Sequence, residues 1–228
     1  TGMVGEFPEL QGVMGREYAL ASGEPKEVAA AIYEHYLPRS ANDAMPAGDP
    51  GALIGIADRL DTICAIFGIG KKPTGAADQY GLRRACIAII NLVQSRGYRF
   101  SLGAAIDKAL HFLDPKLKDL KRKAGEPPLR EQVLEFFRGR LEALWADSAR
   151  ADVANAVLFA GFDDLVGARL RLDALARRVG GPDFAPLAAT FKRVANIVAK
   201  QAKDVAPAPV EKALLKEPAE VALHAALE

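Results

Sequence analysis

Two aspartates, three residues apart, are the first candidates for chemistry in this sequence. Helical spacing places the carboxylates of Asp58 and Asp61 on one face of a helix. Two such carboxylates could bind a divalent metal ion or act as general acid and base, but a metal site needs further ligands. The sequence has three histidines: His35, His111 and His224. None of them forms a paired metal-binding pattern with the aspartates, so capping or ion pairing by Asp58 and Asp61 is the simpler interpretation.

A glycine-containing turn followed by lysines is the second candidate. Gly68 and Gly70 precede Lys71 and Lys72. Glycines allow backbone N–H groups to approach a phosphate, and lysines add positive charge. The G-x-x-x-x-G-K-[ST] order of a nucleotide-binding loop is absent and the flanking segments have helical patterns. A tight connection between two helices therefore competes with phosphate binding as the interpretation of this turn.

The cysteines do not form a nucleophile or a metal site. Cys64 and Cys86 each lie in an apolar helical pattern, away from any histidine, and no serine lies in a G-x-S-x-G motif. We expect both thiols to be small buried hydrophobic groups rather than a disulfide framework. This cysteine usage is typical of a reducing compartment, and we expect a cytoplasmic protein.

The composition describes a globular chain with no strong overall field. Half of the 228 residues are hydrophobic, and 30 Lys and Arg are balanced by 29 Asp and Glu, which gives a formal net charge of +1. Any contact with nucleic acid must therefore use local basic patches. Charges and glycines interrupt every apolar run before the roughly 18 residues that a membrane span needs. We expect no contact with a membrane.

Hydrophobic periodicity predicts an all-α fold, because no stretch shows the alternation typical of strands. Asp49 and Pro50 are a good start for a buried helix. We expect one face of this helix to carry Leu53, Ile56, Ala57, Leu60, Ile63, Cys64 and Phe67. Asp78 is expected to cap a second helix that ends at Gly97 and pairs with the first as a hairpin. Further helices are expected at 102–113, 129–145, 152–159, 163–179 and 184–203.

Composition shifts predict three regions along the chain. The basic stretch 116–123, closed by Gly125 and Pro127-Pro128, indicates a boundary that separates residues 1–125 from 126–203. Alternating acidic neighbours make a solvated helix face the simpler interpretation of its lysines. Prolines and alanines give 204–218 the composition of a linker within a third region, 204–228. The chain opens without methionine and ends inside a helical pattern, so we expect a piece of a longer polypeptide.

Three ordered segments resemble a known family. They are MVGEFPELQGVMG at 3–15, EHYLPRSANDAMP at 34–46 and ADRLDTICAIFGIGKKPTG at 57–75, and the likeness continues through LRRA at 82–85. Together they resemble the β subunit of bacterial glycyl-tRNA synthetase. A weaker likeness returns at 191–197, so the resemblance covers most of the chain. Between about 98 and 180 only the helical pattern is shared.

The resemblance implies an α2β2 enzyme in which the α subunit activates glycine with ATP and Mg²⁺ and the β subunit binds tRNA(Gly). This segment would have no active site and no cofactor of its own. Residues 1–125 would resemble a His-Asp (HD) phosphohydrolase domain that has lost its catalytic ligands. Residues 126–203 would be a helical extension, and 204–228 the linker and start of the anticodon-binding domain.

The expected nucleic-acid contacts are Lys71, Lys72, Arg83 and Arg84, because the glycine turn beside a capped helix start can present cations and backbone donors together. Two alternatives remain open. One is a metal-dependent HD-type phosphohydrolase that uses Asp58 and Asp61. The other is a structural scaffold whose apolar helix faces dock the α subunit.

Overall fold

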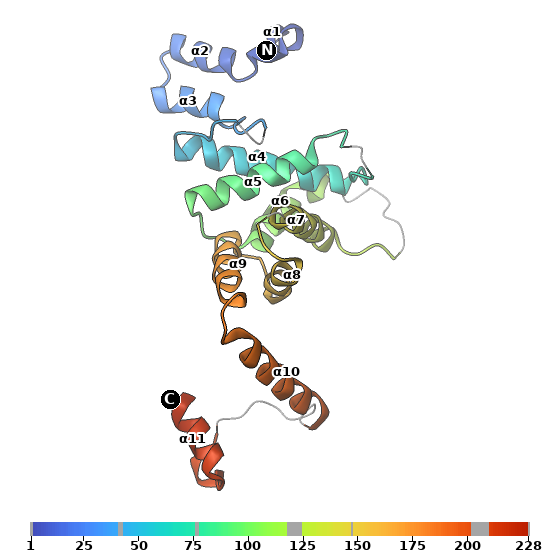
Figure 1. Ribbon diagram of the computed structural model, residues 1–228. Coiled ribbons are helices and arrows are strands. Elements are labelled where there is room, and N and C mark those ends of the chain that lie inside the picture. The colour runs from blue at the N-terminus through green and yellow to red at the C-terminus, as the bar shows by residue number, and fades with distance from the viewer. Residues whose placement is uncertain are drawn as a thin grey trace. The chain divides into compact units, whose positions relative to one another are not determined.

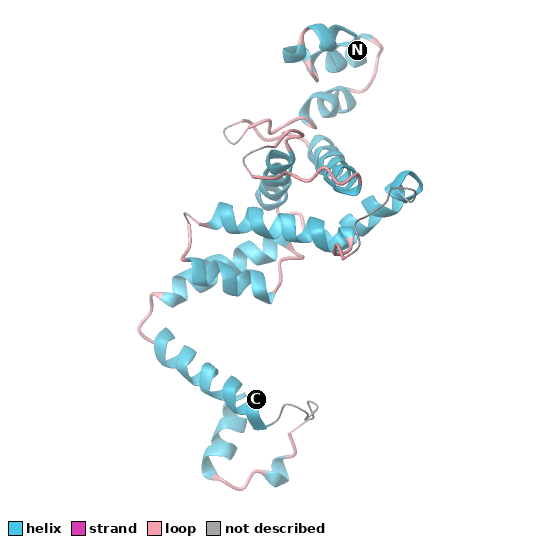
Figure 2. Cartoon of the chain, turned by 90° about the vertical axis from the view of Figure 1, so that its right-hand side faces the viewer, coloured by secondary structure: helices cyan, strands magenta, loops and turns pink. Residues whose placement is uncertain are grey.

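The fold is all-helical in the residues that the structure describes. In a computed structural model of the chain these are residues 2–40, 43–75, 78–117, 125–146, 148–201 and 210–227. Helices and loops account for these ranges, and they contain no strand (Figure 2). The predicted all-α class is confirmed. The chain forms two compact units, Thr1–Val179 and Gly180–Glu228, which are described separately.

The first unit contains nine α-helices and one 3-10 helix within the described residues. They are α1 (Gly2–Glu6), η1 (Pro8–Leu10), α2 (Val13–Ala21), α3 (Lys26–Glu34), α4 (Asp49–Gly68), α5 (Leu82–Arg96), α6 (Leu102–Leu117), α7 (Leu129–Trp145), α8 (Ala151–Ala160) and α9 (Leu165–Val179). Helices α2 and α3 form a hairpin, and so do α8 and α9. Figure 1 shows these pairs at opposite ends of the unit, with α4 to α7 between them.

Helix α4 is the centre of the first unit. It begins at Asp49 with Pro50 in its first turn, as predicted, and it packs against α3, α5, α6 and α7 (Figure 1). The prediction of a single buried apolar face is wrong at two positions, because Leu53 is 53% exposed and Ala57 is also exposed. The closest approach of α3 to α4 is at Gly51 and Gly55, and a pattern of apolar residues does not indicate a contact made by glycines.

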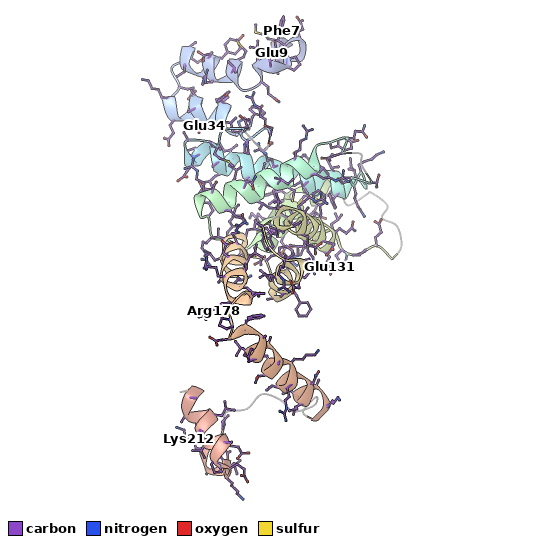
Figure 3. All side chains as sticks on the ribbon, in the orientation of Figure 1. Phe7, Glu9, Glu34, Glu131, Arg178 and Lys212 are labelled. Carbon is purple, nitrogen blue, oxygen red and sulfur yellow. The ribbon has the colours of Figure 1, made fainter. Side chains whose placement is uncertain are left out.

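Glycine makes the contact between α3 and α4 possible. A Cβ atom added at Gly55 would lie 2.7 Å from the carbonyl oxygen of His35, and one at Gly51 would meet the side chain of Glu34. The Oε2 atom of Glu34, at the end of α3 (Figure 3), accepts a hydrogen bond of 3.0 Å from the backbone N–H of Gly48. Close backbone approach and this bond hold the end of α3 against the start of α4.

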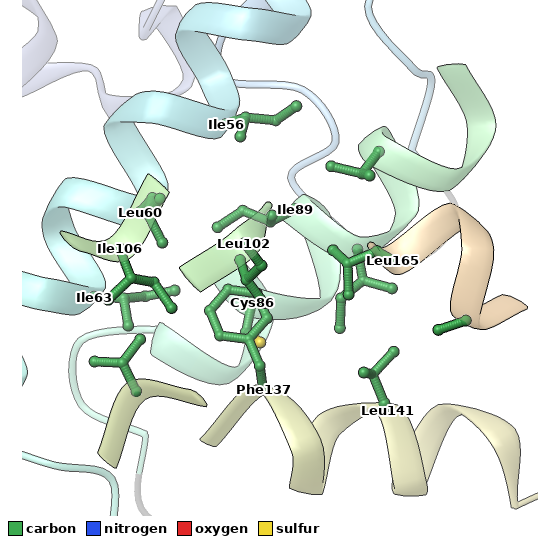
Figure 4. Packing of buried hydrophobic residues seen from close by; sticks show 14 of the residues in the cluster. Ile56, Leu60, Ile63, Cys86, Ile89, Leu102, Ile106, Phe137, Leu141 and Leu165 are labelled. Atoms are coloured by element: carbon green, nitrogen blue, oxygen red, sulfur yellow. The ribbon is translucent and has the colours of Figure 1, made fainter. Parts of the chain in front are cut away.

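One hydrophobic core extends from α4 to α9. Figure 4 shows side chains of α4, α5, α6, α7 and α9 converging on the same interior. Phe137 and Trp145 of α7 are at most 1% exposed, and the helix expected at 129–145 is confirmed. Cys64 and Cys86 are buried in the same core, as predicted.

Helix α5 has well-defined ends. The carboxylate of Asp78 accepts hydrogen bonds from the backbone N–H groups of Leu82, at 2.8 Å, and Arg83, at 3.0 Å. At the other end Gly97 takes the left-handed conformation that commonly terminates helices, with a φ of 68°. Both ends were predicted from the sequence, and both are confirmed. They fix which residues of α5 face the core and which face solvent.

The second unit contains α10 (Phe184–Gln201), η2 (Lys212–Leu214) and α11 (Pro218–Leu227). None of its described residues is buried. The predicted regions 1–125, 126–203 and 204–228 stay predictions. Of the basic stretch 116–123, residues 118–123 lie outside the described residues, as do 202–209 of the predicted linker.

We predict that Phe137→Ala lowers the free energy of unfolding of the first unit by about 3–5 kcal/mol, because it opens a cavity at a residue with no exposed surface. Phe112→Ala is the matched control, since Phe112 is 65% exposed, and its expected effect is within about 0.5 kcal/mol. Urea denaturation followed by circular dichroism measures both. Equal losses in the two variants would contradict the assigned core.

Candidate nucleic-acid interface

Three of the four predicted cations line pockets, and these pockets are separate; Arg83 is in neither lining. Lys71 and Lys72 line a pocket of about 100 Å³ together with Asp78 and Leu82, which we call the lysine pocket. Arg84 lines a different pocket, on another side of α5. The structure therefore brings the two lysines together but does not place Arg84 with them.

Backbone donors at the lysine pocket already have a partner. The two N–H groups at the start of α5 donate to Asp78, so an anion there would compete with a carboxylate. Arg83 donates to the carbonyl oxygen of Gly75, and Lys72 lies 3.4 Å from the carboxylate of Glu126. Such a solvent-exposed ion pair is weak and screened by salt. The available charge of this pocket therefore comes mainly from the exposed Lys71 and the partly exposed Lys72.

The second pocket joins two arginines from different parts of the chain. It has a volume of about 170 Å³, and we call it the Arg39–Arg84 pocket. Its lining residues are Pro38, Arg39, Ser40, Arg84, Ile87, Ala88 and Asn91. Two guanidinium groups, a hydroxyl and an amide surround an apolar surface, and no acidic side chain is in this lining. These are the side-chain types that contact phosphate and sugar in nucleic-acid complexes.

Arg39 is held in place by groups outside the pocket. Its Nη2 atom donates a hydrogen bond of 3.2 Å to the carbonyl oxygen of Gln11, and its guanidinium lies 5.4 Å from the centre of the Tyr33 ring. Arg16 contacts the same ring at 4.9 Å. Asp43 is close by: the backbone N–H of Arg39 donates to its carboxylate and lowers the pKa of that group. The ionised Asp43 therefore offsets part of the positive charge of Arg39.

Arg59 of α4 holds the segment that leads into Arg39. Its guanidinium donates to the carbonyl oxygens of His35 and Tyr36, both at 2.8 Å, of Gly55 at 2.9 Å and of Pro38 at 3.2 Å. Burial lowers the pKa of this guanidinium, while the nearby Asp58 raises it. Four backbone acceptors thus satisfy a partly buried cation and fix the chain between α3 and the Arg39–Arg84 pocket.

The sequence did not reveal this arrangement. Arg39 lies in the segment 34–46 that resembles the family, but no spacing rule connects it with Arg84, because helix α4 separates them in the chain. The described hydrogen bonds of Arg59 go to backbone carbonyl groups, and no spacing of side chains in the sequence indicates such bonds. A helical face of α5, formed by Arg84, Ile87 and Asn91, was the one available signal.

The aspartates Asp58 and Asp61 lie exposed on α4. Within the described ranges no group of three or more His, Cys, Asp and Glu side chains could hold a metal ion. His35 is engaged in the fold, since its Nδ1 atom lies 3.2 Å from the carbonyl oxygen of Ala31 and its ring contacts Tyr36. The described residues therefore do not supply the ligands that the phosphohydrolase alternative requires.

The thiol groups of Cys64 and Cys86 are unreactive. Burial, with a smaller effect of the Asp61 charge, raises the pKa of Cys64 to about 12. Burial likewise raises the pKa of Cys86, against an opposing effect of Arg140. Both groups are protonated at neutral pH and are poor nucleophiles.

Among the described helices, none combines the length and the apolar character needed to cross a membrane.

The described residues form helices, and two of their pockets are lined by cationic side chains. They include no cluster of metal ligands. The class of protein is therefore an all-helical segment with candidate sites for anions. A family model described as "Glycyl-tRNA synthetase beta subunit" matches residues 1–159. The chain belongs to the glycyl-tRNA synthetase beta subunit family, as its sequence motifs predicted.

Similar proteins extend the match beyond residue 159. Over 99% of this chain, 66% of residues are identical to the "Glycine--tRNA ligase beta subunit" of Myxococcus xanthus. Proteins of the same name from Geobacter sulfurreducens and Anaeromyxobacter dehalogenans are 56% and 51% identical over the whole chain. The chain covers 32% of each of these relatives, so it spans about a third of their length.

We predict that Arg59→Met lowers the free energy of unfolding by about 1–3 kcal/mol, because partly buried carbonyl groups lose their donor while the size of the side chain is kept. Arg138→Met is the matched control, since the pair of Arg138 with Glu142 lies on the surface of α7 and contributes about 0.5 kcal/mol or less. Urea denaturation compares them. A loss for Arg59→Met no larger than that of the control would contradict the role given to Arg59.

Proposed function

We propose that this chain is part of the tRNA-binding β subunit of a glycine–tRNA ligase and helps to position tRNA(Gly). The α subunit of an α2β2 enzyme would then join glycine to the tRNA with ATP and Mg²⁺. This segment contributes no active site and binds no cofactor. The observation that supports the proposal is the end-to-end similarity to proteins named glycine–tRNA ligase β subunit, at 66% identity for one of them.

The contact with tRNA is proposed to be electrostatic and local. Since the formal net charge is only +1, the chain as a whole does not attract RNA. The Arg39–Arg84 pocket and the lysine pocket supply cations at fixed positions, because the Arg59 contacts and the ends of α5 hold the backbone near them. Phosphate contacts of this kind set the register and orientation of a bound nucleic acid without reading its sequence.

A second proposed role, docking of the α subunit, is supported by a groove between α3 and α4. Its volume is about 370 Å³, and its lining residues are Glu27, Val28, Ala31, Ile32, His35, Pro50 and Ile54. Val28 and Ile54 are 43% and 49% exposed. Exposed apolar grooves of this type are typical of protein contacts. Light scattering of the full-length β chain with and without the α subunit, for Ile54→Gln against the wild type, tests this role.

We predict that Arg39→Gln combined with Arg84→Gln in the assembled enzyme raises KM for tRNA(Gly) about thirtyfold and leaves kcat unchanged. Two phosphate contacts of about 1 kcal/mol would be lost, and they act in the ground state and in the transition state alike. Lys71→Gln combined with Lys72→Gln tests the lysine pocket in the same assay. The measurement is steady-state glycylation with varied tRNA.

The matched control is Arg138→Gln, which removes a surface cation of α7 that lies at neither pocket. Its expected KM for tRNA is that of the wild type. Unchanged KM in both pocket variants would exclude these cations as tRNA contacts. A fall in kcat with unchanged KM would instead place the effect after binding and contradict a positioning role through phosphate contacts.

A further inference from the structure

An exposed tyrosine lies beside the two lysines of the lysine pocket. Tyr80 lines this pocket and is 44% exposed. The lining also includes Lys71, Lys72, Thr74 and Gln79. No ring–ring or cation–ring contact between described residues involves Tyr80, whereas the ring of Tyr33 contacts two arginines. The Tyr80 ring is therefore accessible to a ligand that binds at the lysine pocket.

A defined turn holds Tyr80 in this place. The backbone N–H of Gly81 donates a hydrogen bond of 3.0 Å to the carbonyl oxygen of Asp78, so Gln79 and Tyr80 are the central residues of a four-residue turn. Gly81 has a φ of 66°, a conformation that glycine adopts without strain. The next residue, Leu82, is fully buried and fixes the turn to the core. A ring presented by fixed backbone loses little freedom when it binds a ligand.

Lysines beside an exposed aromatic ring are typical of sites for single-stranded nucleic acid. Bases stack on aromatic side chains, and cations contact the adjacent phosphates. Lysines alone would serve paired and unpaired RNA alike, but in a duplex the neighbouring base pairs already cover each base. The hydroxyl of Thr74 and the amide of Gln79 are groups that can form hydrogen bonds with the edge of a base. The aromatic ring is thus the feature that favours an unpaired nucleotide.

We propose that the lysine pocket binds one unpaired nucleotide of tRNA, whose base stacks on Tyr80 while its phosphate contacts Lys71 and Lys72. This inference rests on the proposed tRNA contact at this pocket and adds the kind of nucleotide that binds there. Sites that enclose a small molecule have volumes of roughly 300–1,000 Å³. The lysine pocket, at about 100 Å³, is smaller, which suits a single base stacked on an open surface.

The acidic groups near the pocket leave this charge largely available. Asp78 lines the pocket, but its carboxylate already accepts two backbone N–H groups at the start of α5. Glu126 pairs with Lys72 at 3.4 Å on the surface, where a phosphate can compete with a weak, screened ion pair. Lys71 is exposed and is expected to make the main phosphate contact.

Two substitutions at one position of the assembled enzyme test the stacking. Tyr80→Ala is expected to weaken binding of tRNA(Gly) about tenfold, because the stacking surface is lost. Tyr80→Phe is expected to bind as the wild type does, because the ring is kept. Tyr18→Ala is the matched control, since Tyr18 is 47% exposed on α2 and lines neither pocket. Fluorescence anisotropy of labelled tRNA, without glycine and ATP, measures all three.

The salt dependence of binding separates stacking from charge. Tyr80→Ala removes no cation, so we expect it to keep the wild-type slope of log affinity against log salt concentration. Lys71→Gln combined with Lys72→Gln is expected to reduce that slope by about 0.7 for each lost phosphate contact. Wild-type affinity and slope in the lysine variant would overturn the tRNA contact at this pocket, and the inference with it. Weaker binding of the lysine variant with unchanged binding of Tyr80→Ala would overturn the inference alone.

Ultraviolet crosslinking of the wild-type complex identifies the nucleotide. Mass spectrometry is expected to find the peptide that contains Tyr80 joined to a nucleotide outside the base-paired stems of the tRNA. Links to paired nucleotides only would overturn the proposal. So would equal weakening by Tyr80→Phe and Tyr80→Ala, since the hydroxyl rather than the ring would then be the contact. Loss of α-subunit binding by Tyr80→Ala in the absence of tRNA would also overturn it, because the ring would then belong to a protein contact.

Discussion

The burial of α4 on several sides is the constraint on which the rest of the first unit depends. Four helices pack against it, so its surface has to satisfy different neighbours at once. Large apolar side chains such as Leu60 and Ile63 face the core with α5, α6 and α7, whereas Gly51 and Gly55 let α3 approach. A helix of this kind cannot be amphipathic in the simple sense, because more than one of its faces is covered.

The same constraint places the candidate interface. Arg59 extends from α4 and binds the carbonyl oxygens at the end of α3, which directs the following residues toward α5. Asp78 and Gly97 fix the two ends of α5, and with them the orientation of Arg84. The Arg39–Arg84 pocket is therefore a consequence of how the core is packed. Cations held on a rigid scaffold lose less freedom on binding than cations on a mobile loop, which suits a role in positioning a large ligand.

Features that depend on neighbours in the sequence were predictable, and features that depend on tertiary contacts were not. The cap at Asp78, the end of α5 at Gly97 and the apolar spacing of α7 follow from local chemistry, and the structure has all three. Leu53 was expected to be buried because it shares the apolar pattern of α4, but α3 packs on a glycine side of that helix instead. Likewise, the sequence could not show that Arg39 and Arg84 line the same pocket, because this depends on how the chain between α3 and α4 folds back toward α5.

We propose that this segment contributes to holding tRNA by local phosphate contacts. The most direct test is a titration of the chain with glycine tRNA and with a non-cognate tRNA, each at low and at physiological salt. We expect binding at low salt that weakens steeply as salt rises, with a slope of about 0.7–0.9 in a plot of log affinity against log salt concentration for each phosphate contact. Absence of binding to either tRNA at low salt would contradict the proposed tRNA contact. It would favour docking of the α subunit as the role of this segment.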